Sequence, residues 1–102
     1  MPTLHTVNKS PFERSAMASC LNHVTDGDSV LMIEDAVVGA RKGTALADDL
    51  RDRQRTCALY VLGPDLVARG LKPDDLIEGI TVVDYAGFVD LAARNMRVCA
   101  WL

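Results

Sequence analysis

The segment LHTVNKSPFE at residues 4–13 predicts a β-strand, a short turn and the start of a helix. Its first four residues include two β-branched ones, which favour a strand. Ser10 and Glu13 have the spacing of a capping box, and Pro11 suits the first turn of a helix. The chain therefore opens with a strand–turn–helix unit, from which α/β domains are built.

The predicted helix carries a thiol on its apolar stripe. Helical spacing relates Phe12, Ala16, Cys20 and Val24. His23 follows Cys20 by three positions, so the two side chains can share one face of the helix. A protonated imidazole beside a thiol favours the thiolate. Cys20 and His23 are therefore the candidate site residues. The alternatives are inert packing of Cys20 in the core and a solvated position of His23 near the helix end.

Apolar runs alternate with helical segments along the rest of the chain. Strands are expected at 30–33, 58–62, 80–83 and 98–101, and helices at 36–41, 44–53, 65–69 and 85–94. Continuous apolar strands separated by helices are typical of a parallel sheet that is covered on both faces. The sequence thus predicts one domain over residues 1–102, a three-layer α/β/α fold of the flavodoxin-like kind with a five-stranded, mainly parallel sheet.

Polar residues follow several of the predicted strands. In a parallel sheet these positions meet at one edge, where α/β proteins place their sites. They hold Asn8, Lys9, Glu34, Asp35 and Asp84. We expect Asp84 to cap a helix, and Glu34 with Asp35 to cap a turn rather than form an acid–base pair. The rim has no glycine-rich phosphate loop, so a small anion-binding site beside Lys9 is only an alternative function.

Composition excludes several classes of protein. The 102 residues are 49% hydrophobic, and 11 basic against 14 acidic residues give a formal charge of −3. A net acidic domain gains little from binding phosphates, so direct nucleic-acid binding is disfavoured. No apolar run approaches the roughly 20 residues that cross a bilayer, and the N-terminus has no signal-peptide pattern. We therefore expect a cytoplasmic protein that does not bind membranes.

The three cysteines, Cys20, Cys57 and Cys99, are odd in number and widely spaced. They include no C-x-x-C pair and no cysteine–histidine cluster, so neither a zinc site nor a disulfide framework is expected. Free cysteine is among the most buried residue types. Cys57 and Cys99 are therefore predicted to be buried packing residues.

Five segments in this order carry a resemblance to a known family: HTVNKSPFE at 5–13, LMIEDAVVGARKGT at 31–44, YVLGPDLVARGL at 60–71, VVDYAGFVDL at 82–91 and the terminal AWL. They resemble the DsrH/TusB family of sulfur-relay proteins over essentially the whole chain, and they are closer to DsrH. The resemblance implies a DsrEFH-like fold and a place in a heterohexamer with DsrE/TusD-like and DsrF/TusC-like sister subunits.

The resemblance also implies a function in sulfur transfer. Such complexes receive sulfur as a cysteine persulfide and pass it to an acceptor of the DsrC/TusE type, for dissimilatory sulfur oxidation or for 2-thiouridine in tRNA. Cys20 matches a position where DsrH-type members keep a cysteine, which implies an auxiliary persulfide carrier with His23 as its helper. The main carrier belongs to the DsrE-type subunit, so a non-catalytic structural subunit is the alternative. Thiol exchange requires no metal or organic cofactor.

The chain ends in an apolar Trp101-Leu102 pair, which would fray unless it is held down. Either the last strand is anchored within the domain or another subunit covers it. We expect an oligomer, and in the isolated chain homo-oligomers that replace the missing partners.

Overall fold

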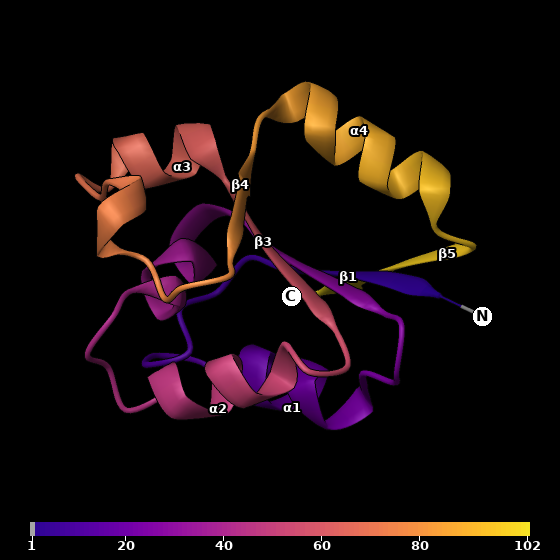
Figure 1. Cartoon of the computed structure of the whole chain (residues 1–102), viewed down its shortest axis with the longest axis horizontal. Helices are drawn as coiled ribbons and strands as arrows, with labels where there is room; N and C mark the ends of the chain where they lie inside the picture. The colour runs from indigo at the N-terminus through magenta and orange to yellow at the C-terminus, as the bar shows by residue number, and fades with distance from the viewer. Residues whose placement is uncertain (1) are drawn as a thin grey trace.

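The computed structural model describes residues 2–102, which form one parallel sheet with the strand order β4-β3-β2-β1-β5 (Figure 1). The strands are β1 (Thr3–Val7), β2 (Ser29–Met32), β3 (Ala58–Leu62), β4 (Thr81–Val83) and β5 (Arg97–Trp101). The helices are α1 (Ala16–His23), α2 (Ala47–Arg53), α3 (Gly63–Ala68) and α4 (Tyr85–Arg94), with the 3₁₀ segments η1 (Glu34–Ala40) and η2 (Pro73–Asp75). All strand pairs are parallel, which confirms the predicted fold class.

Helices cover both faces of the sheet. Helices α1 and α2 lie together on one face, and α4 lies on the other, as Figure 1 shows. The larger core fills the α1/α2 side and includes Val7, Met17, Val30 and Leu50. The smaller core, built on Leu4, Leu31 and Leu91, lies under α4. Neighbouring residues of β1 and β2 thus enter different cores, because side chains alternate across a strand.

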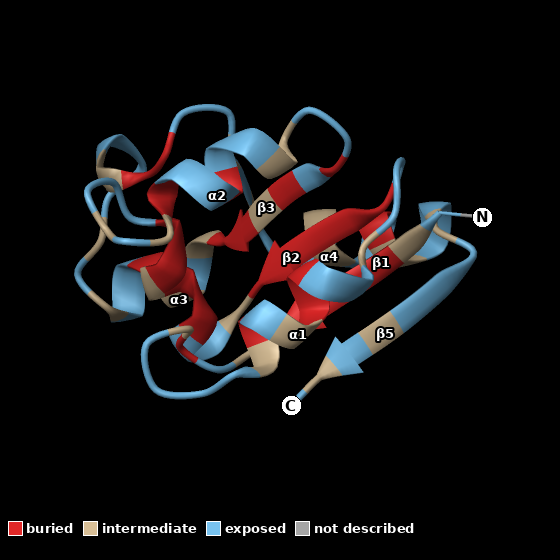
Figure 2. Ribbon diagram, turned by 90° about the horizontal axis from the view of Figure 1, so that it is seen from below, coloured by how far each residue is buried: buried red, intermediate tan, exposed pale blue. Residues whose placement is uncertain are grey.

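Burial falls from the centre of the sheet to the edge formed by β5. All four residues of β2 are buried, whereas β5 is exposed at three of its five positions (Figure 2). The C-terminal strand pairs with β1, so the last strand of the chain lies beside the first. This edge position explains why the apolar runs at 30–33 and 98–101 have such different environments.

Helix α1 begins later than the capping pattern predicts. Its first residue is Ala16, and Phe12 is 55% exposed, so Phe12 does not join the apolar stripe. Ser10 accepts a hydrogen bond from the Phe12 amide at 3.2 Å and starts a turn instead. The Pro11 ring packs against Gly39, where an added Cβ would lie 2.8 Å from it. This contact with η1 holds residues 11–14 outside the helix.

Helix α4 has the bounds and the cap that the sequence predicts. The Asp84 carboxylate accepts a hydrogen bond from the Gly87 amide at 2.8 Å. We expect Asp84→Ala to lower the free energy of unfolding by about 1 kcal/mol, because one amide at the helix start loses its partner. Asp90→Ala, which removes an exposed ion pair with Arg94, is the control and should change it by less than about 0.5 kcal/mol. Chemical denaturation measures both variants, and an equal loss of unfolding free energy in the two would contradict the capping role of Asp84.

Among residues 2–102, no helix has the length and apolar character needed to cross a membrane.

Candidate functional site

Cys20 lies on the inner side of α1 and is completely buried. Burial raises the pKa of its thiol from 9.0 to about 12, and Coulombic interactions with Cys99, Cys57 and Asp28 add to this effect. The Arg53 guanidinium opposes it. Cys20 is therefore a protonated thiol at neutral pH, closed off from any thiol partner in solution.

Arg53 is the cation that acts on this thiol. It lies in the last turn of α2 and is partly buried. Its Nη1 donates to the Leu21 carbonyl of α1 at 2.6 Å, and its Nε donates to Asp49 at 3.1 Å. The bond to Leu21 ties α2 to α1 beside Cys20. The two residues are far apart in sequence, so no local pattern could reveal this contact.

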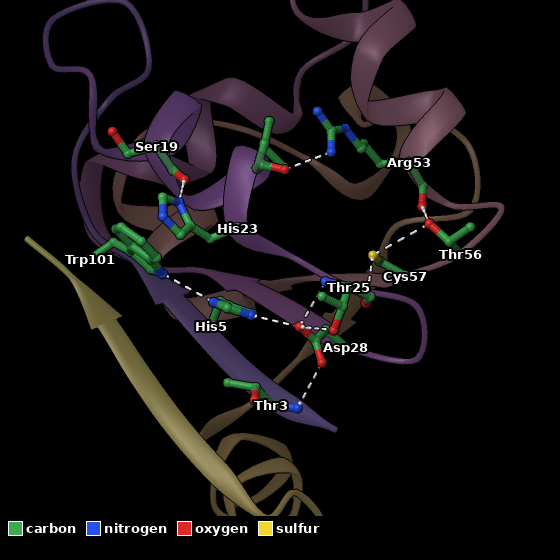
Figure 3. A network of polar contacts seen from close by, with 11 residues as sticks. Thr3, His5, Ser19, His23, Thr25, Asp28, Arg53, Thr56, Cys57 and Trp101 are labelled. Carbon is green, nitrogen blue, oxygen red and sulfur yellow. Dashed lines mark hydrogen bonds and ion pairs between the residues drawn. The ribbon is translucent and has the colours of Figure 1, made fainter. Parts of the chain in front are cut away.

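His23 is exposed and turns toward the end of the chain (Figure 3). Its Nδ1–H donates to the Ser19 carbonyl at 2.7 Å. Its ring packs against the indole of Trp101, with the ring centroids 5.2 Å apart. The structure thus brings together His23 and Trp101, a pair that the sequence analysis did not connect.

The two other thiols have different environments. Cys57 is buried, and its Sγ lies 3.7 Å from the Thr25 carbonyl and 3.6 Å from the Thr56 hydroxyl. Cys99 lies opposite His5 in the register of β1 and β5 and is only partly buried. The prediction of a buried packing residue is correct for Cys57. It is wrong for Cys99, because β5 is an edge strand.

The structure contains a buried polar network below α1 that the sequence analysis did not predict (Figure 3). His5 and Asp28 are 5% and 3% exposed, and His5 Nε2 lies 2.9 Å from the Asp28 carboxylate. Asp28 also accepts hydrogen bonds from the Thr3 and Thr25 amides at 2.9 and 3.0 Å. On the other side, Trp101 Nε1–H donates to His5 Nδ1 at 3.1 Å. One carboxylate thereby connects β1, the turn before β2 and, through His5, the end of β5.

The hydrogen bonds of this network change the acidity of Asp28. Burial alone would raise the pKa of its carboxyl group, but the bonds donated by Thr25, His5 and Thr3 outweigh burial and lower this pKa. Asp28 is therefore ionised at neutral pH although it is buried, since its charge is satisfied by donors.

Glu34 and Asp35, which follow β2, bond to residues in and after α3. The Glu34 amide donates to the Asp65 carboxylate at 2.7 Å, in a backbone conformation (φ 50°) that is uncommon outside glycine. Asp35 pairs with Arg69 at 2.8 Å. Lys9 is exposed at the same edge. Across residues 2–102, no cluster of three or more His, Cys, Asp or Glu side chains could hold a metal ion. These contacts join η1 to α3 and form no acid–base pair.

Comparisons with known proteins match nearly the whole chain. A family model described as "DsrH like protein" matches residues 9–98. A protein called Protein TusB from Erwinia tasmaniensis is 40% identical over 98 residues, which are 96% of this chain and 99% of that protein. Protein TusB from Escherichia coli K12 is 33% identical over the same coverage.

Two solved structures share the fold at low sequence identity. The protein of unknown function MTH1491 from Methanobacterium thermoautotrophicum superposes with a TM-score of 0.81 and 14% identity, covering 97% of each chain. The ychN protein from E. coli superposes with a TM-score of 0.81 and 13% identity, covering 98% of this chain and 99% of that one. At such identities the likeness concerns the fold alone.

Proposed function

Since the chain belongs to the DsrH-like family, whose TusB members it matches at 33–40% identity, we propose that it is a subunit of a sulfur-relay complex. The family match over residues 9–98 is the observation that carries the proposal. The partners would be DsrE/TusD-like and DsrF/TusC-like sister subunits, which form a heterohexamer with this chain in the cytoplasm. An acceptor of the DsrC/TusE type would take the sulfur.

The surface of the chain supports a role in assembly. Large apolar side chains are exposed on α4 and β5 and in the segments that adjoin them: Tyr85, Val89, Met96, Val98 and Leu102. Several large exposed apolar side chains on neighbouring elements are consistent with a protein–protein contact, and an uncovered edge strand offers free backbone groups to a partner. We infer that a sister subunit covers this side of the domain.

A structural subunit is the role that the burial of Cys20 supports. If Cys20 also carries sulfur, assembly must first open α1. Its thiolate would then attack the outer sulfur of a donor persulfide, the donor thiolate would leave, and Cys20 would hold Cys-S-S⁻. A thiolate of the acceptor would attack that outer sulfur next and release the Cys20 thiolate. His23 packs on Trp101, so Arg53 is better placed than His23 to favour such a thiolate.

Coexpression with the two sister subunits from the same genome tests the proposed assembly. Light scattering after gel filtration should show one stoichiometric complex that contains this chain. Val98→Arg on β5 should abolish or strongly weaken the complex, because it buries an unpaired charge in the contact. The control is Val67→Arg, at a valine of α3 that is 77% exposed, and it should leave assembly intact. A sister-subunit complex that excludes this chain would contradict the proposal.

The pathway can be assigned with a strain that lacks this chain. Loss of 2-thiouridine from tRNA would identify the tRNA branch of the family, and unchanged tRNA with impaired sulfur oxidation would identify the other branch.

A further inference from the structure

The ring of His5 is held between a donor and an acceptor in the buried layer below α1. The indole N–H of Trp101 can only donate, so His5 Nδ1, 3.1 Å away, carries no proton. The proton is therefore on Nε2, which donates to the Asp28 carboxylate at 2.9 Å. The two partners together select one neutral tautomer of His5.

We propose that His5 is a protonation-sensitive latch that holds the C-terminal end of β5 through Trp101. When Nδ1 takes up a proton it becomes a donor, and two donors then face each other. The bond to Trp101 is lost, while the bond to Asp28 is kept and becomes an ion pair. Proton uptake at one buried atom thus releases the side chain that ties the end of the chain to β1.

The end of β5 is the element that this release would affect. Within the described residues β5 pairs with β1 along one side, and Trp101 is its last residue. The indole stacks near His5, with ring centroids 6.2 Å apart, and also contacts the exposed ring of His23. Without the bond to His5, these ring contacts and the backbone pairing alone hold the strand end. The free edge of β5, which we propose a sister subunit covers, includes this strand end.

Titratable and charged groups face this layer from every neighbouring element: Asp28 before β2, Cys99 on β5, Cys20 and His23 on α1, Arg53 on α2 and Cys57 before β3. The carboxylate of Asp28 lies 2.9 Å from His5 Nε2, and the guanidinium of Arg53 adds a positive charge to the same layer. Between about pH 5 and 8, histidine is the side chain that ordinarily changes charge. The sequence has two histidines, so replacing His23 isolates the titration of His5.

NMR of the ¹⁵N-labelled full chain tests the latch between about pH 8 and pH 5. At the upper pH the imidazole nitrogens of His5 should report the Nε2–H tautomer, and the Trp101 indole proton should be protected from exchange with water. As His5 takes up its proton, protection of the indole proton should fall about tenfold, as expected for the loss of one hydrogen bond. The sequence has one tryptophan, so its signal is unambiguous.

Two variants separate the latch from a merely structural contact. Trp101→Phe keeps an aromatic ring but removes the donor, so the proton affinity of His5 should rise about threefold to tenfold. His23→Gln should leave the tautomer and the indole response unchanged. The proposal is overturned by an Nδ1–H tautomer at the upper pH, or by an indole that stays protected beside protonated His5. It is equally overturned by an unchanged proton affinity in Trp101→Phe, or by unfolding before His5 takes up a proton.

Discussion

Replacing Asp28 with alanine is expected to lower the free energy of unfolding by about 3 kcal/mol, because it leaves several donors without an acceptor. The carboxylate accepts hydrogen bonds from Thr3, His5 and Thr25. Asp28 and His5 are both buried, so water cannot replace the bond between them without opening the structure. Each unsatisfied buried donor costs about 1–3 kcal/mol.

Asp26→Ala is the matched control for this variant. Asp26 lies two residues earlier in the same turn and is exposed, so its removal should change the free energy of unfolding by less than about 0.5 kcal/mol. Urea denaturation followed by circular dichroism measures both variants. A loss in Asp28→Ala as small as that of the control would show that the network does not stabilise the fold.

The same carboxylate predicts how the stability of the chain depends on acid. The pKa of Asp28 is lowered in the folded chain, so the unfolded state binds more protons as the pH falls. The contribution of Asp28 is therefore complete above the ordinary carboxyl pKa of about 4 and is lost as the pH falls through the lowered value. The difference in stability between the wild type and Asp28→Ala should shrink over that range. A difference that is constant with pH would contradict the charge state assigned to Asp28.

Cys20 in the folded, isolated chain is expected to react at least about 30-fold more slowly with a persulfide donor than in the unfolded chain. The rise of its pKa from 9.0 to about 12 lowers the thiolate fraction about 1,000-fold. A more basic thiolate is also more nucleophilic, which offsets this loss of rate by roughly 30-fold. Complete burial of the side chain slows the reaction further.

A variant with Cys57→Ser and Cys99→Ser leaves Cys20 as the single thiol and allows this measurement by mass spectrometry. Addition of Cys20→Ser to that variant gives the thiol-free control. Rapid gain of one sulfur at Cys20 in the folded isolated chain would contradict the closed site. Gain of sulfur only after assembly with the sister subunits would identify Cys20 as a carrier that the complex opens. No gain even there would leave this subunit a scaffold of the relay.

Elements specified by local residues could be predicted from the sequence. The bounds of β3 and of α4 match the predicted ranges, because a compact apolar run defines the strand and an aspartate cap begins the helix. The start of α1 could not be predicted in this way. The capping pattern of Ser10 is present, but packing of Pro11 on Gly39, more than twenty residues later, decides the local conformation.

In the candidate site, too, the residues specified by a local pattern could be predicted and those brought together by the fold could not. Cys20 was found as a thiol on an apolar helix face, and that face also explains its burial. The groups that surround it come from distant parts of the chain: Arg53 from α2, and the His5–Asp28–Trp101 network from β1, a turn and β5. Such a network has no signature in residue spacing, because it arises only when the sheet order brings the first and last strands together.

Pairing of the first strand with the last also affects how this domain is made. Strand β1 leaves the ribosome early, but its outer neighbour β5 is made much later. Until β5 has been made, one side of β1 has no native partner, and the backbone donors on that side stay open to incorrect pairing. Closing a loop that spans nearly the whole chain is slow, so we expect a high contact order and correspondingly slow folding. A nascent or truncated chain that lacks only its final residues would remain vulnerable to aggregation and proteolysis.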